Sequence, residues 1–317
     1  MAKLWLLGEA LIDFVPTQSD IGPAFAARPG GSPFNAAKAA AQAGADVGFL
    51  GAVSTDLFGE MLIDDLLAHN VNTAQTPRVD DPTTLAFVAL TDGAAKYAFF
   101  NNATATALMA PANTGFEPTA GDVISFGSIS LIDNPGADNL AAFALSHADK
   151  AMISIDPNAR PTMTPDIAAW RDRIGSITDV ASIIRLSDED LELLAPGESP
   201  ESYAQAQLSK SANLVVVTLG AEGVLGFCKE GAVQVPGQKA RIVDTVGAGD
   251  TLMGSLLAEV LLRELNTKHA LANLSAATLS EILRYGVMAS AINCESAGCA
   301  PPNRETVLAR LSKQSSG

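Results

Sequence analysis

The sequence predicts an α/β fold in which a mostly parallel, doubly wound sheet lies between helices and a second, small β-sheet is added to it. Along most of the chain, short apolar runs alternate with segments whose apolar residues recur at helical spacing. The run 214–218 (LVVVT) is apolar almost throughout, which is typical of a strand buried on both faces of a parallel sheet. Two more strands, over 83–90 and 96–100, flank Thr91-Asp92-Gly93, so a hairpin is expected to interrupt the alternation. We expect this hairpin and part of residues 14–30 to form a small sheet that covers a site.

The elements around the main sheet follow from the same periodicity. Strands are expected where apolar residues run together before a polar or glycine-containing turn, over 4–7, 46–51, 123–126, 151–155, 181–184 and 214–218. Helices are expected where apolar residues recur near every 3.6 positions, over 33–44, 56–69, 139–148, 167–174, 252–261 and 278–293. Pro33 suits the first turn of the first helix, and Gly44 suits its end.

Length, charge and cysteine content limit the functions that are open to the chain. Its 317 residues, 48% hydrophobic and 17% charged, can build one large domain or two small ones. The formal net charge of −15 argues against nucleic acid or an anionic membrane as a partner, but not against a nucleotide bound at a local site. Cys228, Cys294 and Cys299 are too few and wrongly spaced for a disulfide framework or a zinc site, so a cytoplasmic protein is expected. We expect neither a signal peptide nor a membrane span, because no apolar run reaches roughly 18 residues.

The stretch 244–250 (DTVGAGD) is typical of a turn that opens a helix and binds an anion. Gly247 and Gly249 let the backbone approach a ligand, and the free N–H groups at a helix start attract phosphate. A carboxylate beside such a site, here Asp250, is expected when it handles a proton. The pattern therefore indicates phosphoryl transfer, with Asp250 as the base and the backbone of Gly247, Ala248 and Gly249 as the anion hole. Taken alone, the motif also fits an N-capping aspartate in a tight turn.

A second glycine-rich turn, Gly30-Gly31, feeds another expected helix. Asn35 near its start can donate to and accept from a hydroxylated ligand, or can simply cap an alanine-rich buried helix. Asp13, just past the first strand, fits either a ligand contact or a solvated turn. Ligands of doubly wound sheets lie beyond the carboxyl ends of the strands. The residues expected at such ends are Asp13, Arg160, Ser187, Thr218 and Asp250.

Two further segments suggest metal and nucleotide contacts. Residues 185–190 offer Ser187, Glu189 and Asp190, which could hold water around Mg²⁺ or could simply be an acidic helix start. Thr218 to Gly220 could seat nucleotide phosphates or cap the next element. The sequence has no Gly-x-x-x-x-Gly-Lys-Ser/Thr loop, no protein-kinase motif set and no Gly-x-Gly-x-x-Gly after the first strand.

Together these motifs resemble those of the ribokinase-like (PfkB) carbohydrate kinases. The runs 30–37 (GGSPFNAA) and 244–251 (DTVGAGDT) resemble the two signatures of that family. Between them, 156–160 (DPNAR), 186–191 (LSDEDL) and 218–223 (TLGAEG) occur in the family's order and at its usual spacing. Each motif alone is weak, but five in order are specific, and the resemblance extends from about residue 4 to 303. The opening run and the motifs GGSPFN and DPNAR are most similar to those of fructokinases.

The resemblance implies a three-layer α/β/α sandwich, one carbohydrate kinase domain over 1–317, with a lid from about 14–30 and 83–103. It implies transfer of the γ-phosphate of ATP to a primary hydroxyl of a ketose, with fructose to fructose 6-phosphate ranked first. Mg²⁺ would be required, and a monovalent cation such as K⁺ could bind. The expected partners are the sugar, ATP and a second copy of the chain, which would pair through the lid.

The resemblance also assigns roles residue by residue. Catalysis would fall to Asp250 as base, to the anion hole of Gly247, Ala248 and Gly249, and to Arg160 near the transferred phosphate. The sugar would contact Asp13, Gly30, Gly31, Asn35, Phe99, Asn102 and Asp250. ATP would contact Ser187, Thr218, Gly220, Gly223, Gly249 and Asn293. Asp190 would organise Mg²⁺ through water, and Asp244 and Val246 would lie at the monovalent cation.

Departures from the family pattern leave the sugar open. Fructokinases usually carry Arg and Asp after the lid strand, where this chain has Asn102 and Thr106. Loss of that Arg removes a rigid donor fork from the sugar end of the site. A kinase of 2-keto-3-deoxygluconate or of another ketose is therefore the alternative. The carboxylate of 2-keto-3-deoxygluconate would be expected to bind cationic side chains, but this segment has Asn101 and Asn102 instead. This observation weighs against 2-keto-3-deoxygluconate as the substrate.

Two milder departures and one further class of function remain. Arg185 replaces the more usual Lys, and Asp190 replaces Glu. A catalytically idle regulator that binds sugar or nucleotide is the alternative from another class. Such a regulator would be expected to lack the catalytic base or the anion hole, whereas this chain retains Asp250, Gly247 and Gly249.

Overall fold

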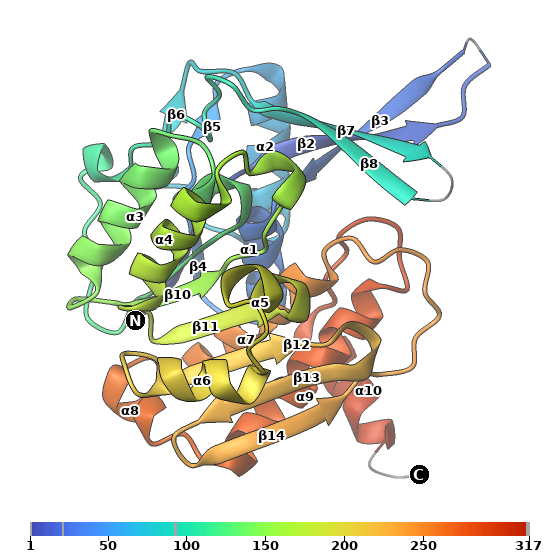
Figure 1. The fold of residues 1–317 in the computed structure, drawn as a ribbon. Coiled ribbons are helices and arrows are strands. Elements are labelled where there is room, and N and C mark those ends of the chain that lie inside the picture. Colours follow the sequence, from blue (N-terminus) through green and yellow to red (C-terminus); the bar gives the residue numbers. More distant parts are fainter. Residues whose placement is uncertain (1, 21, 92–93, 315–317) are drawn as a thin grey trace.

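The computed structural model describes residues 2–20, 22–91 and 94–314 (Figure 1). Its largest sheet has eight strands in the order β14-β13-β12-β11-β10-β9-β1-β4. In chain order these strands are β1 (Leu4–Leu7), β4 (Val47–Phe49), β9 (Val123–Gly127), β10 (Met152–Asp156), β11 (Ile183–Ser187), β12 (Leu214–Thr218), β13 (Gly223–Cys228) and β14 (Gly231–Pro236). Neighbouring strands are parallel from β4 to β12, and β13 and β14 pair antiparallel at one edge. The expected mostly parallel sheet is confirmed.

Helices cover both faces of this sheet because its buried strands send alternate side chains to opposite sides. On β1, Leu4 and Leu6 join one apolar cluster, whereas Trp5 and Leu7 join another. The first cluster is covered by α1 (Ser32–Gln42), α2 (Leu57–Ala68), α7 (Ala248–Leu262), α8 (Lys268–Ala272), α9 (Ala276–Asn293) and α10 (Arg304–Gln314). The second is covered by α3 (Gly136–His147), α4 (Ile167–Thr178), α5 (Asp188–Leu194) and α6 (Pro200–Leu208). The expected three layers are therefore present.

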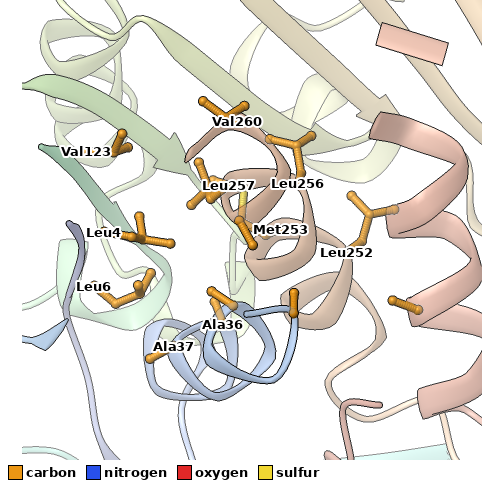
Figure 2. Packing of buried hydrophobic residues seen from close by; sticks show 14 of the residues in the cluster. Leu4, Leu6, Ala36, Ala37, Val123, Leu252, Met253, Leu256, Leu257 and Val260 are labelled. Carbon is orange, nitrogen blue, oxygen red and sulfur yellow. The ribbon is translucent and has the colours of Figure 1, made fainter. Parts of the chain in front are cut away.

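Helices α1 and α7 pack closely against each other, and both lead into the site. Figure 2 shows Ala36 of α1 facing Met253 of α7. Gly254 permits this approach, because a Cβ atom there would lie 2.3 Å from the carbonyl oxygen of Ala36. Small residues on both helices thus hold the amino-terminal ends of α1 and α7 side by side.

A second sheet of four strands, in the order β3-β2-β7-β8, projects from the main body (Figure 1). Its strands are β2 (Leu11–Thr17), β3 (Ala24–Gly30), β7 (Thr84–Thr91) and β8 (Ala94–Phe100). The expected small sheet is present, although it begins at Leu11 rather than near residue 14. The expectation that Asp13 follows a main-sheet strand is wrong, because Asp13 lies within β2 and pairs with Arg28 of β3. The middle of the expected turn, Asp92-Gly93, lies outside the described residues.

The remaining elements are short or weakly patterned. A two-stranded sheet joins β5 (Val53–Ser54) to β6 (Arg78–Val79), and the 3₁₀ helices are η1 (Pro111–Thr114), η2 (Ser128–Leu131), η3 (Pro161–Met163) and η4 (Gly220–Glu222). Helices α5, α6, α8 and α10 are additions to the sequence-based expectation. Within the described part of the chain, no helix combines the length and apolar character that a membrane crossing requires.

Candidate active site

Asp250 lies where the two glycine-rich motifs meet. It is the third residue of α7, whose N-cap is Gly247 with φ 73°, so the N-cap alternative for Asp250 is wrong. Ser32 Oγ donates to Asp250 Oδ1 at 2.6 Å, and Asn35 Nδ2 donates to Oδ2 at 2.9 Å. Both donors belong to α1, so the packing of α1 on α7 fixes the carboxylate.

The environment of Asp250 has opposing effects on its charge. Burial raises the pKa of Asp250, whereas the hydrogen bonds from Ser32 and Asn35 and the charges of Arg160 and Arg185 lower it. Burial outweighs the opposing contributions, so the pKa of Asp250 is raised, and a raised pKa makes a carboxylate a stronger proton acceptor. The group is therefore held ready to accept a proton.

Asp13 approaches the same point from the small sheet. Burial and the charge of Asp250 raise the pKa of Asp13 to about 6. A Cβ atom on Gly30 would lie 2.5 Å from Asp13 Oδ2, so glycine leaves room for this carboxylate. Phe99 lies on the same face of the sheet as Asp13, because both are in register with Ala86 of β7. The structure thus brings Asp13, Gly30, Asn35 and Asp250 together.

The two asparagines at the end of β8 have different surroundings. Asn102 is exposed, whereas its neighbour Asn101 is buried. Asn101 Nδ2 donates to Asp133 Oδ2 at 2.7 Å, and Asn101 Oδ1 accepts from Thr84 Oγ1 at 2.7 Å. Thr106 is buried, and its hydroxyl has no hydrogen-bond partner among the described residues. Asn101, rather than Asn102, belongs to the ordered polar network behind the small sheet.

The start of α7 has the form of an anion site. Gly247 takes a left-handed conformation, and the helix proper begins at Ala248. The amide of Ala248 donates to the carbonyl of Thr245 at 3.2 Å, so an anion would share this donor. The positive end of the α7 helix dipole also lies at this turn, which favours binding of an anion there.

Arg185 adds a cation to this anion site, although its sequence position suggested only a conservative replacement. A Cβ atom on Gly249 would lie 3.0 Å from Arg185 Nη2, so the guanidinium lies against the start of α7. Arg185 Nη1 pairs with Asp156 Oδ2 at 2.7 Å, and Nη2 donates to Thr218 Oγ1 at 2.8 Å. Burial is the main cause that raises the pKa of Asp156 to about 6. Arg185 is therefore a buried cation held rigidly beside the backbone of Gly249.

Arg160 is exposed and folds over its own loop. Its Nη1 donates to Asn158 Oδ1 at 2.7 Å and to the carbonyl of Ala159 at 2.9 Å. Its positive charge acts to lower the pKa of Asp250, although burial raises that pKa overall.

Ser187 and Asp190 form a capping box at the start of α5. Ser187 Oγ accepts from the amide of Asp190 at 3.0 Å, and Asp190 Oδ2 accepts from the amide of Ser187 at 2.8 Å. Asp190 Oδ1 accepts from the amide of Ala159 at 2.7 Å, which ties α5 to the Arg160 loop. No group of three or more His, Cys, Asp or Glu that could hold a metal occurs in residues 2–20, 22–91 or 94–314. Both carboxylate oxygens of Asp190 already accept backbone hydrogen bonds, so a metal near Asp190 would meet it through water.

The other predicted ATP and cation residues lie in two groups of loops. Thr218 ends β12, Gly220 begins the 3₁₀ turn η4 behind it, and Gly223 follows that turn. Asn293 is fully buried; its Nδ2 donates to the carbonyl of Val246 at 2.9 Å and its Oδ1 accepts from Ala300 at 2.8 Å. Asp244 Oδ2 accepts from the amide of Gly298 at 2.8 Å. Asn293 and Asp244 thus fasten the loop before α7 to the loop after α9.

Comparison with known proteins shows the family of the chain. The model of the pfkB family of carbohydrate kinases matches residues 1–306. A fructokinase of Rhizobium leguminosarum bv. trifolii is 37% identical over 276 residues, covering 86% of this chain and 84% of that protein. The crystal structure of a Xylella fastidiosa fructokinase with bound ATP superposes with a TM-score of 0.90 at 26% identity, covering 99% of both chains. A Vibrio cholerae fructokinase bound to fructose, ADP and calcium gives a TM-score of 0.84 at 25% identity over 98% of both chains. The chain therefore belongs to the pfkB family of carbohydrate kinases, and its fold is the ribokinase-like sandwich of that family.

Proposed function

We propose that this carbohydrate kinase transfers the γ-phosphate of ATP to the primary hydroxyl of fructose and forms fructose 6-phosphate. The observation that carries the proposal is the meeting of Asp250, Asn35 and Asp13 at the start of α7. The relatives named fructokinase, and the neighbours whose structures hold ATP or fructose with ADP, support the same choice.

In the proposed reaction, Asp250 accepts the proton of the attacking hydroxyl while the sugar oxygen bonds to the γ-phosphorus and ADP leaves. Negative charge on the transferred group would be met by the backbone from Gly247 to Gly249, by Arg185 and by Arg160. Asp13, Gly30, Gly31, Asn35 and Phe99 would hold the sugar. Thr218, Gly220 and Gly223 would line the ATP site, with Ser187 and Asn293 shaping its loops.

Two cations would assist the phosphoryl transfer. Asp190 would hold Mg²⁺ through water, and the metal would supply neutralisation of charge on the phosphates of ATP. The carbonyls of Asp244 and Val246 would contact a monovalent cation such as K⁺. The carbonyl of Val246 already accepts a hydrogen bond from Asn293, which would orient it.

The small sheet would act as a lid on a single catalytic domain. Its inner face carries Asp13 and Phe99, so closure over the sugar would exclude water from the phosphate and limit ATP hydrolysis.

A homodimer through the outer face of the small sheet is part of the proposal. Phe14 and Phe87 stack there with ring centroids 4.6 Å apart, and Phe25 and Phe100 border the pair. Phe25 is 44% exposed and Phe100 59% exposed, so an aromatic patch faces outward. Exposed aromatic patches of this kind are typical of protein interfaces. We further propose a cytoplasmic enzyme, which suits its three free thiols.

The experiment that tests the activity is ADP release with ATP and Mg²⁺ against fructose, tagatose, 2-keto-3-deoxygluconate, ribose, adenosine and no sugar, each with and without K⁺. Turnover highest with fructose supports the proposal. Turnover highest with another ketose would keep the chemistry and replace the sugar. Turnover with none of them would reject the proposed activity.

A further inference from the structure

Ser32 contacts the proposed base directly, although it is not among the residues that the family signatures assigned to the site. It is the first residue of α1 and follows Gly31, whose φ is 110°. From there its hydroxyl reaches Asp250 Oδ1 at 2.6 Å, across 218 positions of sequence. This is the shorter of the two hydrogen bonds that α1 makes to the carboxylate.

Ser32 is itself held from behind by Glu9. Glu9 is 1% exposed, and its Oε1 accepts from the amide of Ser32 at 3.1 Å. Glu9 Oε2 accepts from the amide of Ser130 in η2 at 3.3 Å. The Glu9 backbone also lies under the turn, because a Cβ atom on Gly31 would come within 2.6 Å of its carbonyl oxygen. Glu9 therefore links the end of β1, the start of α1 and η2 around one serine.

We propose that Ser32 is a positioning residue for the catalytic base, and that Glu9 positions Ser32. The Ser32 hydroxyl fixes the orientation of the Asp250 carboxylate and stabilises its ionised form, so that a free lone pair can accept the proton of the sugar hydroxyl. This inference rests on the proposed function, because it assumes that Asp250 is the base.

The surroundings of Asp250 indicate the direction of the effect. The charges of Arg160 and of Arg185 of β11 lower the pKa of Asp250. The charge of Asp250 in turn raises the pKa of three groups that face it, Asp13 of β2, Asp156 of β10 and the Cys299 thiol. Burial raises the pKa of Asp250, and the hydrogen bond from Ser32 opposes this most strongly. Loss of that donor must therefore raise the pKa further, while Asn35 still holds the other oxygen.

The test is the pH profile of kcat/KM for Ser32→Ala. We expect its acidic limb to move to higher pH by about one unit, the scale of one hydrogen bond to a charged group, with near-normal turnover above the shifted limb. Ser32→Thr, which keeps the hydroxyl, should restore the wild-type limb. Ser154→Ala is the control, because Ser154 is a serine of the main sheet whose buried hydroxyl has no partner among the described residues.

Asp250→Asn is measured in parallel so that the two proposals can fail separately. A wild-type pH profile in Ser32→Ala, with Asp250→Asn inactive, would overturn the role of Ser32 alone. An active Asp250→Asn enzyme would overturn the base itself. If Ser32→Ala melts early, Ser32→Cys is measured instead, since its weak S–H donor should give a smaller shift in the same direction.

The role of Glu9 is tested by coupling. Glu9→Gln replaces one acceptor oxygen by an NH₂ group, which cannot accept from either backbone amide. We expect it to shift the acidic limb in the wild-type background and to add little in the Ser32→Ala background. Equal shifts in both backgrounds would show that Glu9 acts independently of Ser32 and would reject that half of the proposal.

Discussion

Asn35 Nδ2 donates to Asp250 Oδ2 at 2.9 Å, although 215 positions separate the two residues. The bond joins the two glycine-rich motifs, which makes them one site. Because Asp250 is the proposed base, Asp250→Asn should lower turnover by ~10²-fold or more. ATP affinity and Tm should change little, since the amide keeps the size of the carboxylate. Steady-state ADP release, with nucleotide binding by calorimetry as the control, measures this; wild-type turnover would contradict the assignment.

Asp13 gives a pH-dependent prediction for stability. Burial raises the pKa of Asp13 in the folded protein to about 6, above its ordinary value of 3.8. The folded state therefore binds more protons between these values, and the contribution of Asp13 to stability is lost as pH rises through about 6. Asp13→Asn removes this loss, so the variant should be more stable than wild type at pH 8, by up to about 3 kcal/mol. The difference should shrink toward pH 4.

Urea unfolding at several pH values measures this effect. Asp20→Asn, in the exposed loop between β2 and β3, is the matched control and should not change the profile. The same Asp13→Asn variant should show a raised KM for the sugar if Asp13 contacts it. A stability difference that does not vary with pH would count against the buried carboxylate as its cause.

Arg185 and Asp156 form a buried pair whose two roles can be separated. Arg185→Met leaves Asp156 buried without its cation, which should destabilise the fold by about 3–5 kcal/mol. The double variant Arg185→Met/Asp156→Asn should regain part of that stability. Turnover should be low in both the single and the double variant, because both lack the cation beside Gly249. Recovery of ADP release along with stability would indicate that Arg185 has only a structural role.

The proposed dimer through the outer face of the small sheet can be tested by its mass in solution. Phe100→Asp places a charge in the exposed aromatic patch and should convert the proposed dimer to a monomer in sedimentation. Leu145→Asp on α3, at a residue 46% exposed, is the control and should leave the mass unchanged. A wild-type chain that sediments as a monomer would reject the dimer.

The sequence was informative where the chemistry is local. Glycines at 30, 31, 247 and 249 and the carboxylate of Asp250 follow from backbone and anion-binding requirements that neighbouring residues impose. The alternation of strands and helices predicted the main sheet for the same reason. These features need no knowledge of what packs against them.

Contacts that form only through tertiary packing could not be predicted from the sequence. Ser32 and Arg185 reach Asp250 and Gly249 only after distant elements come together, and no spacing in the chain encodes that approach. The burial of Asn101 and the exposure of Asn102 could not be read from the sequence either, because neighbouring residues beyond a strand end point in different directions.

The close contact of α1 with α7 gives a prediction for a residue outside the site. Gly254→Ala would place a methyl group within 2.3 Å of the Ala36 carbonyl and should push the helices apart. We expect a loss of about 1–3 kcal/mol in unfolding free energy. Turnover should fall as well, because Ser32 and Asn35 would move away from Asp250. Gly286→Ala in α9 is the matched control: its new methyl group would meet its nearest neighbour at 3.5 Å, so stability should hold or rise by up to about 1 kcal/mol. If Gly254→Ala lost stability but kept full turnover, the spacing of α1 and α7 would not control the alignment of the base.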